Sequence, residues 1–188
     1  MPHNVFDPIP DFKTQDISGK VFSSQDLRGR PWLLSFFRFS SCALCNLRIH
    51  ELIRRYPDYQ RKDLEVVAVF ESPAENVRAA VGKQSVPFPL IGDPEARLYD
   101  LFGVETSEAK VQASMGNPDL KSKIEAAAAI GYPLQKEEGS NFYRMPADFL
   151  IGADGRFLAV YYSDVVGDHL PLSTIDAFLL REGQGALQ

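Results

Sequence analysis

Several features that would assign a function class at once are scarce or absent in this sequence of 188 residues. Basic residues come in pairs at most, as at Arg54-Arg55 and Arg61-Lys62, and the net charge is −5. This excludes a nucleic-acid-binding surface of the usual basic kind. No apolar stretch approaches the ~20 residues of a membrane span. The first residues lack the basic and apolar regions of a secretory signal. We therefore expect a cytoplasmic protein without a nucleic-acid or membrane partner.

Cysteine is also scarce, because the chain has only two, Cys42 and Cys45. In a reducing compartment, two cysteines are more typical of a redox-active or metal-binding pair than of a structural disulfide. A structural zinc site normally has four ligands. The chain could add only His3, His50 or His169 to the pair, unless a second subunit contributed. Zinc therefore stays an alternative to redox chemistry.

The rest of the composition is that of a globular domain. Apolar residues make up 45% of the chain and charged residues 24%, which are ordinary values for a folded domain. The length is sufficient to bury a sizeable core. No internal repeat is visible. We predict a single domain over residues 1–188.

A strand, a turn and a helix are predicted around the cysteine pair. Positions 32–37 are apolar except Ser35, as in a strand covered on both faces. Ser40 and Ser41 can cap the following helix by accepting hydrogen bonds from its first N–H groups. We expect this helix to end before Pro57, which lacks an N–H and disfavours helical geometry in the preceding residue.

The two cysteines are predicted to differ in environment. Cys45 begins an apolar stripe at helical spacing and should face inward, together with Ile49, Leu52, Ile53 and Tyr56. Cys42 lies at the helix start, where free N–H groups and the helix dipole stabilise a thiolate. Its pKa should lie below the value of about 8.5 for a free thiol. The alternative interpretation is a pair of buried, inert cysteines.

The remaining pattern predicts an α/β fold with a mixed central sheet flanked by helices. A hairpin of short strands at 12–14 and 20–22 precedes the cysteine segment. Later elements are strands at 64–70, 147–151 and 157–162, a short edge piece at 86–91, helices at 73–81, 94–102 and 171–180, and a loose tail at 183–188. We expect a capping box from Ser72 to Glu75 at the start of the second helix.

Residues 105–143 differ in composition and pattern from the rest of the chain. They contain an alanine-rich helix former at 120–130, bounded by glycines, and a cap-and-proline start at Asn117-Pro118. We interpret this stretch as an insertion lying over the sheet edge or over the site. The alternative is a solvated, partly mobile excursion.

Four stretches together resemble one protein family: PDFKTQDISGKVFSSQDLRGRPWLLSFFR, FRFSSCALC, PFPLIGDPEARLYDLFGV and MPADFLIGADGRFLAVYY. They resemble peroxiredoxin-like (AhpC/TSA-type) proteins of the thioredoxin fold, here with a thioredoxin-style cysteine pair. The resemblance implies that a Cys42 thiolate reduces peroxides and that Cys45 resolves the intermediate. It further implies an external thiol reductant of the thioredoxin or glutathione type, no cofactor, and a possible homodimer.

The match departs from the family pattern around the peroxide-reacting cysteine. Peroxiredoxins carry Pro-x-x-x-Thr/Ser-x-x-Cys, but Phe39 occupies the Thr/Ser place and Ser35 the Pro place. The second family arginine aligns with Pro146. Arg38, Ser40, Ser41 or Arg144 would have to substitute for the missing peroxide ligands.

Two supporting residues are predicted near the pair. Arg38, four residues before Cys42, could stabilise the thiolate and orient a peroxide. Met145-Pro146 resembles the cis-proline loop of thioredoxins, which packs against the cysteine pair and presents backbone to a disulfide substrate.

Three functions remain open: a thiol peroxidase, a thiol–disulfide oxidoreductase acting on protein disulfides, and a non-catalytic redox switch or metal-binding module. Among other polar residues, His50 is interpreted as a surface histidine and His169 as an anchor of the last helix. Asp148 could point outward at a sheet edge or serve the cysteines as a buried proton relay.

Overall fold

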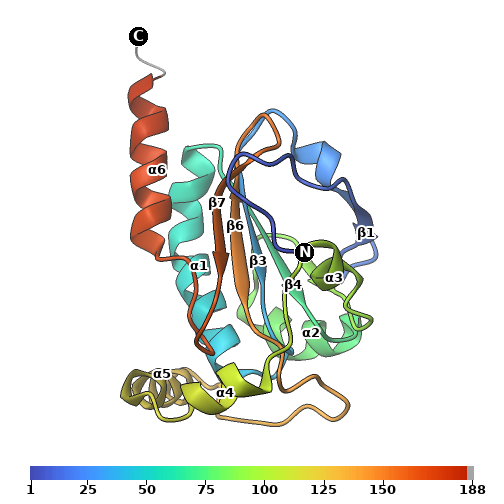
Figure 1. Cartoon of the computed structure of the whole chain (residues 1–188), viewed down its shortest axis with the longest axis vertical. Helices are drawn as coiled ribbons and strands as arrows, with labels where there is room; N and C mark the ends of the chain where they lie inside the picture. The colour runs from blue at the N-terminus through green and yellow to red at the C-terminus, as the bar shows by residue number, and fades with distance from the viewer. Residues whose placement is uncertain (186–188) are drawn as a thin grey trace.

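A five-stranded mixed sheet forms the centre of the computed structural model, which describes residues 1–185 (Figure 1). Its spatial order is β5 (Leu90–Gly92), β4 (Glu65–Phe70), β3 (Trp32–Phe36), β6 (Ala147–Ile151) and β7 (Phe157–Tyr162). β3, β4 and β5 are parallel, whereas β6 and β7 run antiparallel to their neighbours. The predicted mixed sheet with a closing hairpin is confirmed.

The apolar core has two parts because side chains alternate along each strand. In β3, Leu33 belongs to one buried cluster, and Leu34 and Phe36 belong to the other. The first cluster includes residues of α1 (Ala43–Arg61), α2 (Ala74–Ala80) and α6 (Leu172–Gly185). The second includes residues of α3 (Arg97–Leu101) and of the N-terminal segment. Helices therefore flank both faces of the sheet, as predicted.

The other elements lie around this frame. The predicted entry hairpin is present as β1 (Lys13–Gln15) paired antiparallel with β2 (Val21–Ser23). Two short 3-10 helices follow β2 and α2, respectively η1 (Ser24–Leu27) and η2 (Val81–Gln84). None of the helices among residues 1–185 is long and apolar enough to cross a membrane.

Residues 105–143 contain α4 (Glu108–Ser114) and α5 (Pro118–Ala129). The side chain of Asn117 caps α5 by accepting a hydrogen bond from the Asp119 N–H at 2.9 Å. α5 lies against α1, and the chain from 131 to 143 then crosses the same end of the molecule without a helix or strand (Figure 1). This end also holds the start of α1.

Two helix ends were predicted wrongly, and the helix predicted to start at 94 starts at Arg97. α1 does not end before Pro57 but continues to Arg61. Its last turns bury Tyr56 and Tyr59, and Tyr56 Oη donates a hydrogen bond to Glu65 Oε1 at 2.6 Å. This packing offsets the cost of about 3 kcal/mol for proline inside a helix. At the other end of the chain, α6 extends to Gly185, so the predicted tail is helical up to that residue; 186–188 lie outside the described residues.

Candidate active site

Cys42 itself, rather than Ser40 or Ser41, is the cap of α1. Its Sγ accepts a hydrogen bond from the backbone N–H of Cys45 at 3.3 Å, the bond that a capping hydroxyl would normally accept. Both cysteines are free thiols, and their exposed fractions are only 3% for Cys42 and 2% for Cys45. Cys45 faces inward, as predicted, and the sulfur of Cys42 lies where the helix start stabilises negative charge.

The two thiols have opposite pKa shifts. Burial raises the pKa of Cys42, but hydrogen bonds from the Cys45 thiol, the charge of Arg38 and the N–H groups of Cys45 and Leu44 outweigh it. Together they lower the pKa of Cys42 to about 7. Burial and the neighbouring Cys42 raise the pKa of Cys45 well above its ordinary value. At neutral pH, Cys42 is therefore the thiol that supplies a thiolate.

We predict that alkylation of Cys42 by iodoacetamide becomes faster with rising pH, has its midpoint near pH 7, and levels off at higher pH. The thiolate is the reactive form, so the rate follows its population. The Cys42 peptide would be quantified by mass spectrometry across a pH series. Arg38→Leu should move the midpoint to higher pH, whereas Arg54→Leu, at an exposed position, should not. A wild-type midpoint near the free-thiol value of about 8.5 would contradict the assignment.

Arg38 is held beside the pair by contacts to the segment before β6. Its Nε donates to the Arg144 carbonyl at 3.0 Å, and its Nη2 donates to the Phe142 carbonyl. The guanidinium lies 5.1 Å from the centroid of the Phe39 ring and 5.0 Å from that of Phe142. Phe39, which occupies the place of the family's Thr/Ser, thus packs its ring against the Arg38 guanidinium. The charge of Arg38 acts on Cys42 through space.

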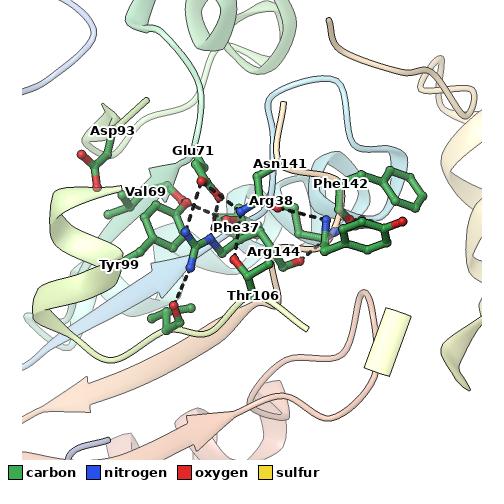
Figure 2. A network of polar contacts seen from close by, with 12 residues as sticks. Phe37, Arg38, Val69, Glu71, Asp93, Tyr99, Thr106, Asn141, Phe142 and Arg144 are labelled. Atoms are coloured by element: carbon green, nitrogen blue, oxygen red, sulfur yellow. Dashed lines mark hydrogen bonds and ion pairs between the residues drawn. The ribbon is translucent and has the colours of Figure 1, made fainter. Parts of the chain in front are cut away.

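Arg144 belongs to the same network of polar contacts as Arg38, and its guanidinium binds other protein groups (Figure 2). Its Nε and Nη2 contact the carboxylate of Glu71 at 2.5 and 3.1 Å, and its Nη1 donates to the Val104 carbonyl at 2.5 Å. The guanidinium also lies over the Tyr99 ring, 4.6 Å from the centroid. Glu71 follows β4, so the pair joins the ends of β4 and the segment leading into β6. Arg144 therefore has a structural role in place of the peroxide contact considered from the sequence.

Pro146 lies close to the site but without the expected geometry. Every peptide bond among residues 1–185 is trans, so the predicted cis-proline loop is wrong in that respect. Met145 belongs to the same buried cluster as Cys42 and Cys45. The Pro146 carbonyl accepts a hydrogen bond from the Ser163 N–H at 3.1 Å. The loop thus packs near the pair while one of its carbonyls is used internally.

Glu137 is a site residue that the sequence analysis missed. Its carboxylate accepts hydrogen bonds from Ser40 Oγ at 2.6 Å and from the Ser41 N–H at 3.2 Å. It also accepts from Ser72 Oγ at 2.6 Å and from Asn76 Nδ2 at 3.2 Å. Burial raises the pKa of Glu137, but these hydrogen bonds lower it overall, which keeps the carboxylate ionised. No periodicity or motif in residues 131–143 signals such a contact.

Ser72 was expected to cap α2 through a capping box, and this prediction is wrong. α2 has Pro73 as its cap residue, without a side-chain hydrogen bond. The Ser72 hydroxyl instead accepts from the Ser40 N–H at 2.9 Å and donates to Glu137. The hydroxyl thus links α2 to the turn before Cys42.

Asp148 and His169 form a buried pair. The Asp148 carboxylate accepts from Ser35 Oγ at 2.6 Å and from the Leu170 N–H at 2.7 Å, and it contacts His169 Nδ1 at 3.0 Å. Burial raises the pKa of Asp148, but His169, Arg48 and Ser35 lower it overall. The groups acting most strongly on Cys45 are Cys42 and Arg38. Asp148 is therefore an inward-facing anchor between the sheet and the start of α6, rather than an outward edge residue.

Metal ligands do not gather around the pair. Among residues 1–181, whose side chains the structure describes, no group of three or more His, Cys, Asp or Glu lies close enough to hold a metal ion. His50 is half-buried on α1, away from the apolar stripe. The geometry of the pair is that of a dithiol.

Comparisons with curated proteins identify relatives over half of the chain. Over 96 residues, the chain is 28% identical to the thiol-disulfide oxidoreductase ResA of Geobacillus thermodenitrificans, covering 50% of this chain and 55% of that protein. Over 95 residues it is 25% identical to a chloroplastic peroxiredoxin Q of Triticum aestivum, covering 50% of this chain and 44% of that protein. The chain thus spans about half the length of these curated relatives.

Similarity in three dimensions extends over the whole chain. A cysteine-to-serine mutant of PrxQ from Xylella fastidiosa superposes with a TM-score of 0.69 at 14% identity, covering 99% of both chains. The peroxidoxin BcpB of Mycobacterium tuberculosis gives a TM-score of 0.66 at 15% identity and 96% coverage of both chains. These matches show a thioredoxin-like fold. Residues 5–158 match the sequence profile of the AhpC/TSA family, and the chain belongs to that family.

Proposed function

We propose that this protein is a thiol-based oxidoreductase that reduces peroxides, with Cys42 as the attacking thiolate and Cys45 as the resolving thiol. One observation carries the proposal. Two free thiols lie one helical turn apart at the start of α1, and the pKa of the first is lowered to about 7 while that of the second is raised. This divides the pair into a nucleophile and a proton-bearing partner.

The reaction follows from these roles. The Cys42 thiolate attacks the terminal oxygen of a hydroperoxide, the O–O bond breaks, and an alcohol leaves after taking up a proton. Cys42 becomes a sulfenic acid. The Cys45 sulfur, losing its proton, then attacks Cys42 Sγ, so that a disulfide forms and water leaves. An external thiol of the thioredoxin or glutathione type reduces the disulfide and is itself oxidised.

Burial of the pair favours a peroxide over a protein disulfide. With only 3% and 2% of their surfaces exposed, Cys42 and Cys45 do not present the exposed sulfur that a protein disulfide would need, whereas a small peroxide needs only a narrow opening. Family membership and the peroxiredoxins among the structural neighbours support the same choice.

A second candidate, reduction of protein disulfides, is favoured by a specific observation. The two arginines near the site already donate to protein groups, Arg38 to two carbonyls and Arg144 to Glu71. Phe39 supplies no hydroxyl for a peroxide. The similarity to ResA over half the chain agrees with this alternative.

Two assays on the wild-type protein separate the candidates. One follows consumption of hydrogen peroxide with a thioredoxin-type reducing system, and the other follows reduction of insulin disulfides. We expect catalytic peroxide consumption and an insulin signal near background. Catalysis only with insulin would instead establish the disulfide oxidoreductase. Inactivity in both assays would reject both enzymes and leave a redox switch or metal-binding module.

A further inference from the structure

The segment 131–143, which we call the strap, connects α5 to the turn before β6. It crosses the end of the molecule where α1 begins and carries no helix or strand (Figure 1). Among residues 1–185, no backbone N–H from 134 to 139 donates to another backbone group. Gly131 and Gly139 have positive φ angles of 93° and 74°, at the start of the strap and just after Glu137. The middle of the strap therefore depends on its side chains for attachment.

The C-terminal end of the strap is fixed independently of Glu137 (Figure 2). Asn141 Nδ2 donates to Thr106 Oγ1 at 2.9 Å and to Glu71 Oε1 at 3.2 Å. Arg38 donates to the Phe142 carbonyl. If the middle of the strap were released, this end would stay in place, and the movement would be confined to the residues around Glu137.

Glu137 attaches the middle of the strap to two other elements. Through Ser40 and Ser41 it holds the turn that precedes Cys42, and through Ser72 and Asn76 it holds the start of α2. Hydrogen bonds to an ionised carboxylate are stronger than those between neutral groups. One side chain thus ties three segments together next to the candidate nucleophile.

A cavity of about 210 Å³ lies between the strap and the start of α1. Gly131 and Tyr132 of the strap line one part of it, and Ser41 and Asn46 line another. The Oγ of Ser41 is buried and has no hydrogen-bond partner among the described residues. The cavity has room for a small molecule beside the residue that precedes Cys42, but not for a loop of another protein.

We propose that Glu137 is a specificity-determining residue. It latches the strap over the turn before Cys42 and so restricts Cys42 to small electrophiles. The proposal deepens the proposed peroxide reduction and rests on Cys42 as its nucleophile. Release of this latch would open the site to larger reaction partners.

The test compares two neutral reagents of the same chemistry and different size, N-ethylmaleimide and a polyethylene-glycol maleimide. In a Cys45→Ser background only Cys42 can react. The ratio of the large-reagent rate to the small-reagent rate should rise roughly tenfold or more in Glu137→Gln, because hydrogen bonds to a charged group are lost. Glu138→Gln, at the exposed neighbouring position, should keep the parent ratio.

Asn76→Ala is the second variant, because it removes a partner of Glu137 without altering the strap. Asn76→Ala, like Glu137→Gln, should raise the ratio of the large-reagent rate to the small-reagent rate. Near-UV circular dichroism verifies that each variant is folded, so that general unfolding is not mistaken for opening. An unchanged ratio in folded Glu137→Gln, or equal acceleration of both reagents, would overturn the proposal. If Glu137→Gln raises the ratio but the wild-type protein does not react with peroxide, the proposed function would be rejected, while the role of Glu137 in excluding large reagents would stand.

Discussion

Replacing Cys42 with serine is expected to reduce peroxide consumption to the uncatalysed rate, a loss of roughly a thousandfold or more. The reason is that Cys42 is the thiol whose pKa is lowered to about 7, whereas a serine hydroxyl at the same position stays protonated. Stopped-flow mixing with hydrogen peroxide under pseudo-first-order conditions measures the reaction directly. The assay needs no reductant for the first turnover.

Cys45→Ser is the matched control for Cys42→Ser. It removes the resolving thiol, so steady-state turnover should stop while the first reaction with peroxide persists. Turnover by Cys42→Ser, together with an inert Cys45→Ser protein, would reverse the two roles. The pair of variants therefore tests the division between nucleophile and resolving thiol rather than the presence of cysteine alone.

The second large effect concerns stability. Asp148→Ala should lower the free energy of unfolding by about 3–5 kcal/mol, because it removes a buried carboxylate and leaves several buried donors without a partner. Ser35 Oγ, His169 and the Leu170 N–H would lose their buried acceptor. Urea unfolding followed by circular dichroism measures the change.

Asp26→Ala, which removes a carboxylate at an exposed position, should stay within about 0.5 kcal/mol of wild type. The lowered pKa of Asp148 also makes the free energy of unfolding depend on pH. Its stabilising contribution is complete above the unfolded-state value of about 3.9 and is lost as the pH falls through the lower folded-state pKa. Equal stability of Asp148→Ala and Asp26→Ala would show that the buried network contributes little.

The sequence was sufficient for the parts of the site that depend on local pattern. Helical spacing placed Cys45 on an apolar stripe, and the structure buries it there. The strand–turn–helix order placed Cys42 at a helix start, and its sulfur caps that helix. Both inferences use only neighbouring residues, since helix periodicity and the helix dipole act within a few turns.

Contacts between distant segments could not be predicted in this way. Glu137 lies 97 positions from Ser40, and the segment around it has no periodic pattern. Ser72 matched a local capping box but binds Ser40 and Glu137 instead. Pro57 shows the same limit, because the burial of Tyr56 and Tyr59 keeps α1 helical beyond a residue that locally disfavours helix. In each case tertiary contacts outweigh the local preference.

The central claim is that Cys42 reacts directly with peroxide and Cys45 resolves the product. Its most direct test is the mass of the Cys42 peptide after one equivalent of hydrogen peroxide, in wild type and in Cys45→Ser. We predict a Cys42–Cys45 disulfide in wild type and, in Cys45→Ser, a Cys42 peptide heavier by one oxygen that a sulfenic-acid reagent traps. An unmodified Cys42 thiol in both proteins after this treatment would contradict the account.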